Sequence, residues 1–276
     1  MELLCLREES ALKIRIKFTK TGSIRYIGHL DVMRYFQKLN RRANIDVKYS
    51  AGFSPHQIMS FAAPLGVGLE SLGEYVDIEV NSTMSSKEAI DALNAASVDG
   101  ITVTGYVRLD DNVANAMSCV AAADYKVRIK DNYKPSTDNI KEAFENFLNQ
   151  QSIVVEKATK KSVMEVDLRP LIFDAYIDDN GDFFMKLSTG SAQNLKPELV
   201  MDAFYKYLGE EMSEFALSIT RLEVYGQNIV KDSSGNIIKE EIIPLLFNHY
   251  VHYTLFSTKK QVKKKQIRLR ICFLIC

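Results

Sequence analysis

The sequence predicts an α+β protein built from two tandem ferredoxin-like domains, each with an antiparallel sheet and the order strand, helix, strand, strand, helix, strand. Two observations lead to this prediction. The same order of alternating, strand-like segments and helix-like segments occurs twice along the chain. The 276 residues, of which 46% are hydrophobic, are also sufficient for two domains with their own cores.

The first predicted strand, residues 13–18, alternates strictly between apolar and basic side chains. The apolar positions share one face, which we expect to be buried: Ile14, Ile16 and Phe18. The basic positions share the other face, which we expect to be exposed: Lys13, Arg15 and Lys17. The strand therefore predicts a surface that attracts anions.

The following helix is expected to begin near Gly28. Its apolar residues recur at helical spacing and should be buried: Val32, Phe36, Leu39 and Ala43. A stripe of cations lies on another side of the same helix: Arg34, Lys38 and Arg41. The helix thus predicts a second basic surface.

The remaining elements of the first copy are less regular. They are a short strand at 45–49, a long irregular segment at 50–74, a strand at 75–80, a helix after the capping-box sequence Ser85–Glu88, and a closing strand at 101–109.

The second copy follows a junction at 110–122 that is rich in Asp, Asn and small residues. Its predicted elements are a strand at 125–129, a helix over 140–148, an extra strand pair at 153–156 and 162–168, a turn at 178–182, a strand at 183–187, a helix from Pro197 that buries Val200, Ala203, Phe204, Tyr207 and Leu208, and a strand at 216–225.

These elements predict the domain boundaries. They are an N-terminal extension at 1–11, a first domain at 12–110 with a loop insertion at 50–74, a linker at 111–123, a second domain at 124–228, and a C-terminal extension at 229–276. The last is partly basic between 259 and 270, and the sequence leaves open whether it is ordered.

The net charge of zero hides a strong asymmetry. Residues 1–60 hold 11 Lys/Arg and 5 Asp/Glu, a net charge of +6, whereas residues 61–120 hold 2 and 9, a net charge of −7. Either the two segments form complementary faces of one domain, or the first one builds an anion-binding face.

The richest candidate site lies in residues 22–31 and 50–56. Arg25 and His29 stand just before or at the start of a helix, whose amides and dipole favour anions, and Ser50 and His56 flank a loop. Alternatively, Arg25 pairs with an acid and both histidines are structural.

His29 could also act as a general base on a ribose hydroxyl, because a helix N-terminus holds the pKa of a histidine low. Four aromatic residues interleave with the cations of this region, as in single-stranded RNA platforms, although such residues often belong to a core: Tyr26, Tyr35, Tyr49 and Phe53.

The second copy offers weaker candidates. Arg169 precedes a proline, and Asn194 lies in a polar segment, 188–198, that leads into a helix N-terminus where an anion could bind. A strand end and a helix cap explain these residues equally simply, and we prefer that interpretation.

No pattern calls for a cofactor or a metal. The sequence has no Walker loop, dinucleotide fingerprint, HExxH or nucleophile elbow, and His29, Asp31 and His56 would form a three-ligand set only if folding joined their loops. The four cysteines are scattered, and no apolar run reaches the roughly 18 residues that span a bilayer, so we expect a cytoplasmic protein with free thiols.

Five motifs resemble the bacterial radical-SAM-linked family, a domain of unknown function that occurs beside, or fused behind, a radical-SAM protein. They are Lys17–Gly22, Arg25–Asp31, Tyr49–His56, Ser60–Leu65 and Glu74–Asp77, and the similarity extends over residues 12–225 with support from Asp167–Pro170 and Gly190–Pro197. Gln57-Ile58 and Lys38-Leu39-Asn40 depart from the family pattern.

The resemblance implies a cytosolic protein with a radical-SAM partner and a role in RNA modification or processing. The leading hypothesis is a non-catalytic, RNA-binding or substrate-presenting accessory protein, with tRNA or rRNA as ligand. The alternatives are a metal-independent endoribonuclease of the tandem ferredoxin-like type that uses His29, and a protein-interaction module only. The candidate anion- or RNA-binding residues are Lys13, Arg15, Lys17, Arg25, His29, Arg34, Lys38, Arg41, Ser50, His56, Arg169 and Asn194.

Overall fold

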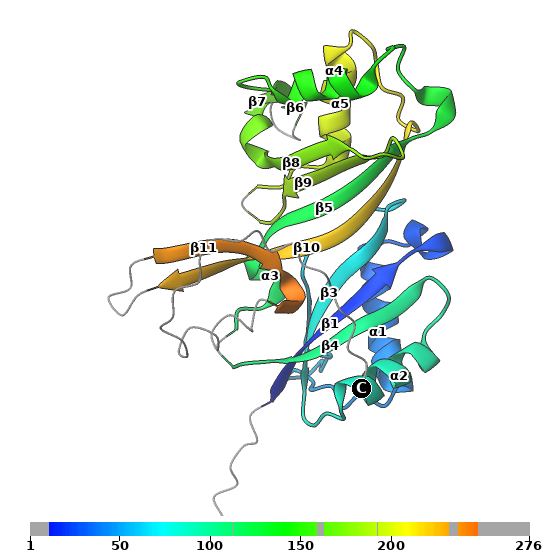
Figure 1. Ribbon diagram of the computed structural model, residues 1–276. Coiled ribbons are helices and arrows are strands. Elements are labelled where there is room, and N and C mark those ends of the chain that lie inside the picture. The colour runs from blue at the N-terminus through cyan, green and yellow to red at the C-terminus, as the bar shows by residue number, and fades with distance from the viewer. Residues whose placement is uncertain (1–10, 112, 159–162, 192, 232–236, 248–276) are drawn as a thin grey trace, which may run out of the picture.

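The computed structural model describes residues 11–111, 113–158, 163–191, 193–231 and 237–247. This part of the chain is a mixed α+β protein with one large, mostly antiparallel sheet and five α-helices (Figure 1). The predicted basic segment at 259–270 and three of the cysteines, Cys5, Cys272 and Cys276, lie outside the described residues.

The strands are β1 (Leu12–Lys20), β2 (Met59–Phe61), β3 (Glu70–Val80), β4 (Ile101–Leu109), β5 (Val120–Ile129), β6 (Val154–Ala158), β7 (Val163–Asp167), β8 (Ile172–Ile177), β9 (Phe183–Ser188), β10 (Leu217–Lys231) and β11 (Ile237–Pro244). The α-helices are α1 (His29–Arg42), α2 (Ser86–Ala96), α3 (Ala116–Cys119), α4 (Ile140–Leu148) and α5 (Pro197–Tyr207). Short 3₁₀ helices are η1 (Gly22–Tyr26), η2 (Asp131–Tyr133), η3 (Arg169–Leu171) and η4 (Leu245–Phe247).

One sheet joins the two halves of the chain. Its strand order is β4-β1-β3-β10-β5-β9-β8, with β2 on β3 and β11 on β10, while β6 and β7 form a separate pair. The contact between β3 and β10 is parallel and short: Thr220 lies opposite Glu70, and Arg221 lies opposite Ser71. We call residues 11–119 the first half, residues 120–247 the second half, and the β3–β10 contact the seam.

The core of the first half confirms the predicted pattern. Ile14, Ile16 and Phe18 are buried, and α1 covers them with the apolar residues predicted for it: Val32, Phe36, Leu39 and Ala43. The capping box of α2 is also present, because the Ser85 side chain accepts from the Glu88 amide while the Glu88 side chain accepts from the Ser85 amide.

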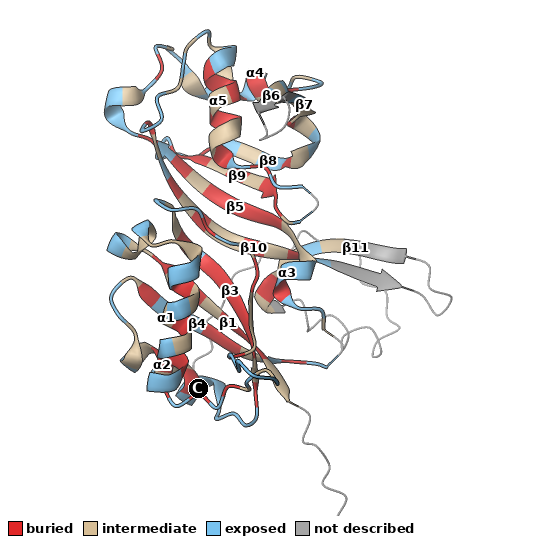
Figure 2. Cartoon of the chain, turned by 180° about the vertical axis from the view of Figure 1, so that it is seen from behind, coloured by how far each residue is buried: buried red, intermediate tan, exposed pale blue. Residues whose placement is uncertain are grey.

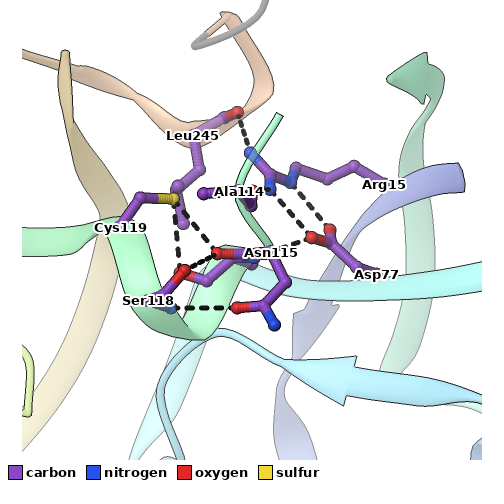
Figure 3. A network of polar contacts seen from close by, with 8 residues as sticks. Arg15, Asp77, Ala114, Asn115, Ser118, Cys119 and Leu245 are labelled. Carbon is purple, nitrogen blue, oxygen red and sulfur yellow. Dashed lines mark hydrogen bonds and ion pairs between the residues drawn. The ribbon is translucent and has the colours of Figure 1, made fainter. Parts of the chain in front are cut away.

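The other face of β1 is not the exposed basic surface that we expected. Arg15 has 0% of its surface exposed and forms a two-pronged ion pair with Asp77, its cross-strand partner on β3, at 2.7 and 2.8 Å. Its guanidinium also donates to the backbone oxygens of Leu245 and Ala114 (Figure 3). The prediction is wrong at Arg15 because η4 and the segment before α3 cover this face.

The two lysines of the same face are engaged as well. Lys13 Nζ donates to the Asp111 carbonyl at 3.3 Å, and Lys17 Nζ lies 2.6 Å from Glu223 Oε2 of β10. Lys17 is therefore held at the contact between the halves.

The core of the second half is aromatic. Phe144 and Phe147 of α4 pack against Phe183 of β9 and Phe204 of α5. Pro197 opens α5 as predicted, but Tyr207, which we expected to be buried, is 46% exposed because it lies at the last turn of α5. In Figure 2, α1 and α2 of the first half and α5 of the second are seen on the same side of the sheet.

Four segments differ from the sequence-based prediction. Residues 45–49 form isolated bridges, Val47 with Val80 and Tyr49 with Gln57, because β2 already occupies the neighbouring edge of β3. Strand β2 lies inside the segment 50–74, which was predicted to be irregular. β5 begins at Val120, within the expected linker, and the described part of the expected C-terminal extension completes β10 and forms β11 and η4.

Candidate functional site

The outer side of α1 carries a basic stripe. Arg34, Lys38, Arg41 and Arg42 are exposed, and Asp31 is the one acidic residue of the helix. Arg34 and Asp31 approach to 3.4 Å, but both side chains are largely exposed, so this pair neutralises the stripe only weakly. The amphipathic pattern that buries Phe36 therefore also directs four cations to solvent.

The loop at 49–57 lies against this helix. Gln57 Nε2 donates to the Gln37 carbonyl of α1 at 3.0 Å and contacts the Tyr49 hydroxyl at 3.3 Å. Arg41 Nε donates to the same Gln37 carbonyl at 3.2 Å. The Gln37 carbonyl thus accepts from both Arg41 and Gln57, and the Gln57 amide in turn contacts Tyr49 of the loop.

Ser50 and His56 close this loop. The Ser50 amide donates to the His56 carbonyl at 2.8 Å, the His56 amide donates to Ser50 Oγ at 3.1 Å, and Ser50 Oγ lies 2.9 Å from His56 Nδ1. Phe53, near the tip, is fully exposed to solvent. The loop is thus a short, closed structure that presents an apolar ring.

We group the exposed side chains of α1 and of the loop that lies against it as the α1–loop surface: Arg34, Lys38, Arg41, Arg42, Tyr49, Phe53 and His56. It combines four cations with two exposed aromatic rings and a histidine.

The predicted pocket of Arg25, His29 and His56 is not formed. Arg25 Nη1 lies 3.2 Å from Glu70 Oε1, and its guanidinium lies 4.9 Å from the centre of the Tyr26 ring. The His29 ring packs edge-on against Phe61, with the two ring centroids 5.3 Å apart and the planes at 89°. His56 bonds to Ser50 in its own loop. Each of the three has found a different local partner.

His29 lines a small cavity of about 10 Å³ together with Lys20 and Glu74. Burial lowers the pKa of His29, nearby Glu74 raises it, and Lys20 lowers it. A volume of about 10 Å³ is close to the room that one water molecule needs. A ribose does not fit there, so the geometry gives no support to His29 as a base on an RNA hydroxyl.

Lys20 holds the turn before α1. Only 2% of its surface is exposed, and its ammonium donates to the carbonyls of Arg25 and Ile27 at 3.2 and 3.0 Å. Burial lowers its pKa, Glu74 opposes this and Arg221 adds to it. The lysine thus fixes the entry to α1 from inside the protein.

The seam contains a second buried ion pair. Arg221 of β10 bonds to both carboxylate oxygens of Glu74 on β3, and its Nη2 also donates to the Ala63 carbonyl at 2.8 Å. Glu223 accepts from the Tyr75 hydroxyl at 2.7 Å and from Lys17. The sequence analysis did not identify Arg221 as a buried residue. Its position could have indicated this, because residues two apart in a strand share a face and Ile219 is buried.

The two candidates of the second half have different environments. The Arg169 amide donates to Asp167 Oδ1 at 3.0 Å, and Arg169 Nη1 donates to the Ile172 carbonyl at 3.2 Å. These bonds fit the interpretation of Arg169 as a residue that shapes a strand end. Asn194 is exposed and lines a cavity of about 330 Å³ between the halves. Glu198, which ends the polar segment 188–198 but was not itself a candidate, lines that cavity from the first turn of α5.

No helix in the described part of the chain has both the length and the apolar character needed to cross a bilayer. No three His, Cys, Asp or Glu side chains within the described ranges gather as metal ligands would.

Residues 13–197 match the model of a family described as "Uncharacterized protein conserved in bacteria (DUF2344)". No curated protein matches the chain. A crystal structure of an unknown protein from Galdieria sulphuraria is 13% identical, covers 76% of this chain and 97% of its own, and has a TM-score of 0.25.

Proposed function

Because the chain belongs to the DUF2344 family of bacterial proteins, whose description assigns no activity, we propose a function from its residues: the protein binds single-stranded RNA through the α1–loop surface. In this proposal it acts as an accessory protein that holds RNA for a partner enzyme. The observation that carries the proposal is the joining of exposed cations and exposed aromatic rings on one surface.

Both components suit an RNA strand. Arg34, Lys38, Arg41 and Arg42 offer charges to phosphates, and each phosphate contact releases counterions. Unpaired bases stack on exposed aromatic side chains, and Tyr49 and Phe53 are the exposed rings of this loop. His56, held by Ser50, stands beside them and can donate or accept a hydrogen bond.

The strand orders support the proposal that each half is a ferredoxin-like unit. The order is β4-β1-β3-β2 in the first half and β10-β5-β9-β8 in the second, so the two halves repeat one arrangement. In the first half the sheet face opposite the helices is covered by α3 and η4, which leaves the helix side for a ligand. This is why we assign RNA binding to α1 and not to Lys13, Arg15 and Lys17.

The partner remains part of the proposal. A radical-SAM enzyme as partner rests on the sequence resemblance alone, and purification of the tagged protein from its native cytosol tests it. Recovery of a radical-SAM protein, with the amount unchanged by ribonuclease treatment, would support direct contact. Recovery of RNA with no such protein would limit the proposal to RNA binding.

The test of RNA binding uses fluorescence anisotropy with labelled single-stranded RNA over a series of salt concentrations. We expect Lys38→Glu with Arg41→Glu to weaken binding strongly and to reduce the slope of log K against log salt by about 0.7 for each lost phosphate contact. Lys87→Glu with Lys141→Glu is the matched control, because it reverses two exposed cations on α2 and α4. Equal loss in both variants, or binding that does not depend on salt, would refute the proposal.

A further inference from the structure

We propose that the cavity between the halves binds a nucleobase that carries an exocyclic amine. Where the base belongs to an RNA strand, this inference rests on the proposed function; a free nucleoside would present the same chemistry. The cavity has a volume of about 330 Å³, near the lower end of the range for small-molecule sites. Two motifs from distant parts of the sequence, 60–65 and 190–197, meet around it.

The first-half wall of the cavity is fixed by the seam. This wall consists of Ala62–Gly66, the segment that follows β2. The Ala62 amide donates to the Tyr75 carbonyl at 3.0 Å, and the Ala63 carbonyl accepts from Arg221 at 2.8 Å. Since Arg221 is itself held by Glu74, the wall is anchored from both strands of the seam.

The second-half wall is fixed by backbone hydrogen bonds and by a glycine. The Thr189 amide donates to the Ala121 carbonyl at 3.0 Å, and the Leu195 amide donates to the Ser188 carbonyl at 2.9 Å. Gly190 has a φ of +149°, and a Cβ there would lie 2.6 Å from the Val120 carbonyl oxygen, so the loop needs glycine at this point. Both walls exist before any ligand binds, which lowers the cost of binding.

The lining suits a flat ring with apolar faces. Much of it is apolar and includes Leu65, Leu69, Met117 and Pro197. The charge of Arg221 is already neutralised by Glu74, so this arginine does not make the cavity an anion site.

The polar end of the cavity points to a ligand that donates a hydrogen bond. Glu198 lines the cavity, and its Oε2, which is closed to solvent, has no hydrogen-bond partner among the described residues. An N–H group of a ligand in the cavity would donate to this carboxylate, which lacks donors from the protein. Carboxylates accept hydrogen bonds from the exocyclic amine of cytosine in nucleic-acid complexes, and adenine and guanine also carry such amines.

The rim of the cavity fits the rest of a nucleotide. Lys196 and Asn194 are exposed there, and both line the cavity. They could contact the sugar or a phosphate while the base lies inside. Uracil has no exocyclic amine and should bind less well.

The first arm of the test measures binding of free cytidine, adenosine, guanosine and uridine by saturation-transfer NMR and calorimetry. We expect the amine-bearing nucleosides to bind more tightly than uridine, and Glu198→Gln to weaken their binding about tenfold, because an amide offers a neutral and weaker acceptor. Glu214→Gln, at an exposed glutamate outside the cavity, is the matched control and should bind like the wild type. Ala63→Leu, which narrows the cavity without a change of charge, should also weaken binding.

The first arm overturns the inference if no nucleoside binds the wild type, or if Glu198→Gln binds all four as the wild type does. Circular dichroism of each variant checks that a loss of binding is not a loss of folding.

The second arm separates this inference from the proposed function, using cytidine-rich and uridine-rich RNA oligonucleotides. We expect Lys38→Glu with Arg41→Glu to weaken both oligonucleotides, and Glu198→Gln to remove only the preference for the cytidine-rich one. Salt-dependent binding without any preference, unchanged in Glu198→Gln, would refute the cavity and leave the proposed function standing. Nucleoside binding without RNA binding would refute the proposed function and leave the cavity as a site for a free nucleoside.

Discussion

Whether a charged residue is paired inside the protein or exposed to solvent decides which surface can bind a polyanion. Arg15 looks like an exposed cation in the sequence, but Asp77 lies directly opposite it on β3 and the pair is buried. Arg25 is likewise occupied by Glu70. At these positions the charge asymmetry between residues 1–60 and 61–120 reflects complementary strands and loops. The exposed cations of α1 have few such partners. The sequence alone does not show which cations are paired and which are exposed.

The protonation of His29 makes the stability of the protein depend on pH. Burial lowers its folded-state pKa below the ordinary value, so the unfolded chain binds a proton more readily than the folded protein does. Stability should therefore fall as the pH drops from above the unfolded pKa of about 6.5 through the lower folded value. We expect the melting temperature of the wild type to decline more steeply between pH 7 and pH 5 than that of His29→Gln.

The groups that surround the His29 ring, Lys20 and Glu74, are present in both proteins, so the difference between the two curves isolates His29. Parallel curves would show that the ring is not desolvated in solution.

At the scale of elements, periodicity predicted the regular parts of the chain well. β1, α1, α2 and α4 carry a clear alternation or a clear apolar stripe, and each lies where its pattern placed it. The pattern at 45–49 was equally strand-like, yet these residues form only isolated bridges. Residues 45–49 and β2 both lie along the edge of β3, and local sequence does not reveal which of the two segments pairs with it as a strand.

Gly73 shows how closely two elements approach at the seam and leads to a stability prediction. A Cβ at this position would lie 2.8 Å from the Leu222 carbonyl oxygen and 2.9 Å from Glu223 Cα, both on the backbone of β10. We expect Gly73→Ala to lower the free energy of unfolding by about 1–3 kcal/mol, as overpacking does in tightly packed sites, measured by urea denaturation.

Gly66→Ala is the control for this change, because its Cβ would meet only Leu69 Cδ1 at 3.5 Å, an ordinary contact. A loss of stability in Gly73→Ala no larger than that in Gly66→Ala would mean that β3 and β10 are not packed this closely.

At the scale of the whole molecule, the sheet is continuous because β3 and β10 pair across the seam. The sequence predicted two repeated units but not how they join, since the parallel contact involves two residue pairs about 150 positions apart along the chain. The cavity between 62–66 and 189–198 follows from that junction and was equally hidden. The two segments that line the cavity stood out in the sequence, but they form a cavity only because the fold brings them together.

The whole molecule also offers a competing surface for RNA. On the second half, Tyr176 of β8 and Phe184 of β9 are stacked with centroids 4.8 Å apart, and Lys126 of β5 lies in register beside Phe184. On this sheet face Lys126 and Arg128 both pair with Asp182, which leaves a net charge of +1, whereas the four exposed cations and the single acid of α1 leave +3. We therefore expect RNA to prefer α1.

Photo-crosslinking of single-stranded RNA that contains 4-thiouridine, followed by mass spectrometry of the crosslinked peptides, tests this assignment most directly. The account predicts crosslinks at Tyr49, Phe53 and the exposed side of α1, lost in Lys38→Glu with Arg41→Glu. Crosslinks concentrated at Tyr176 and Phe184, and unchanged in that variant, would contradict it.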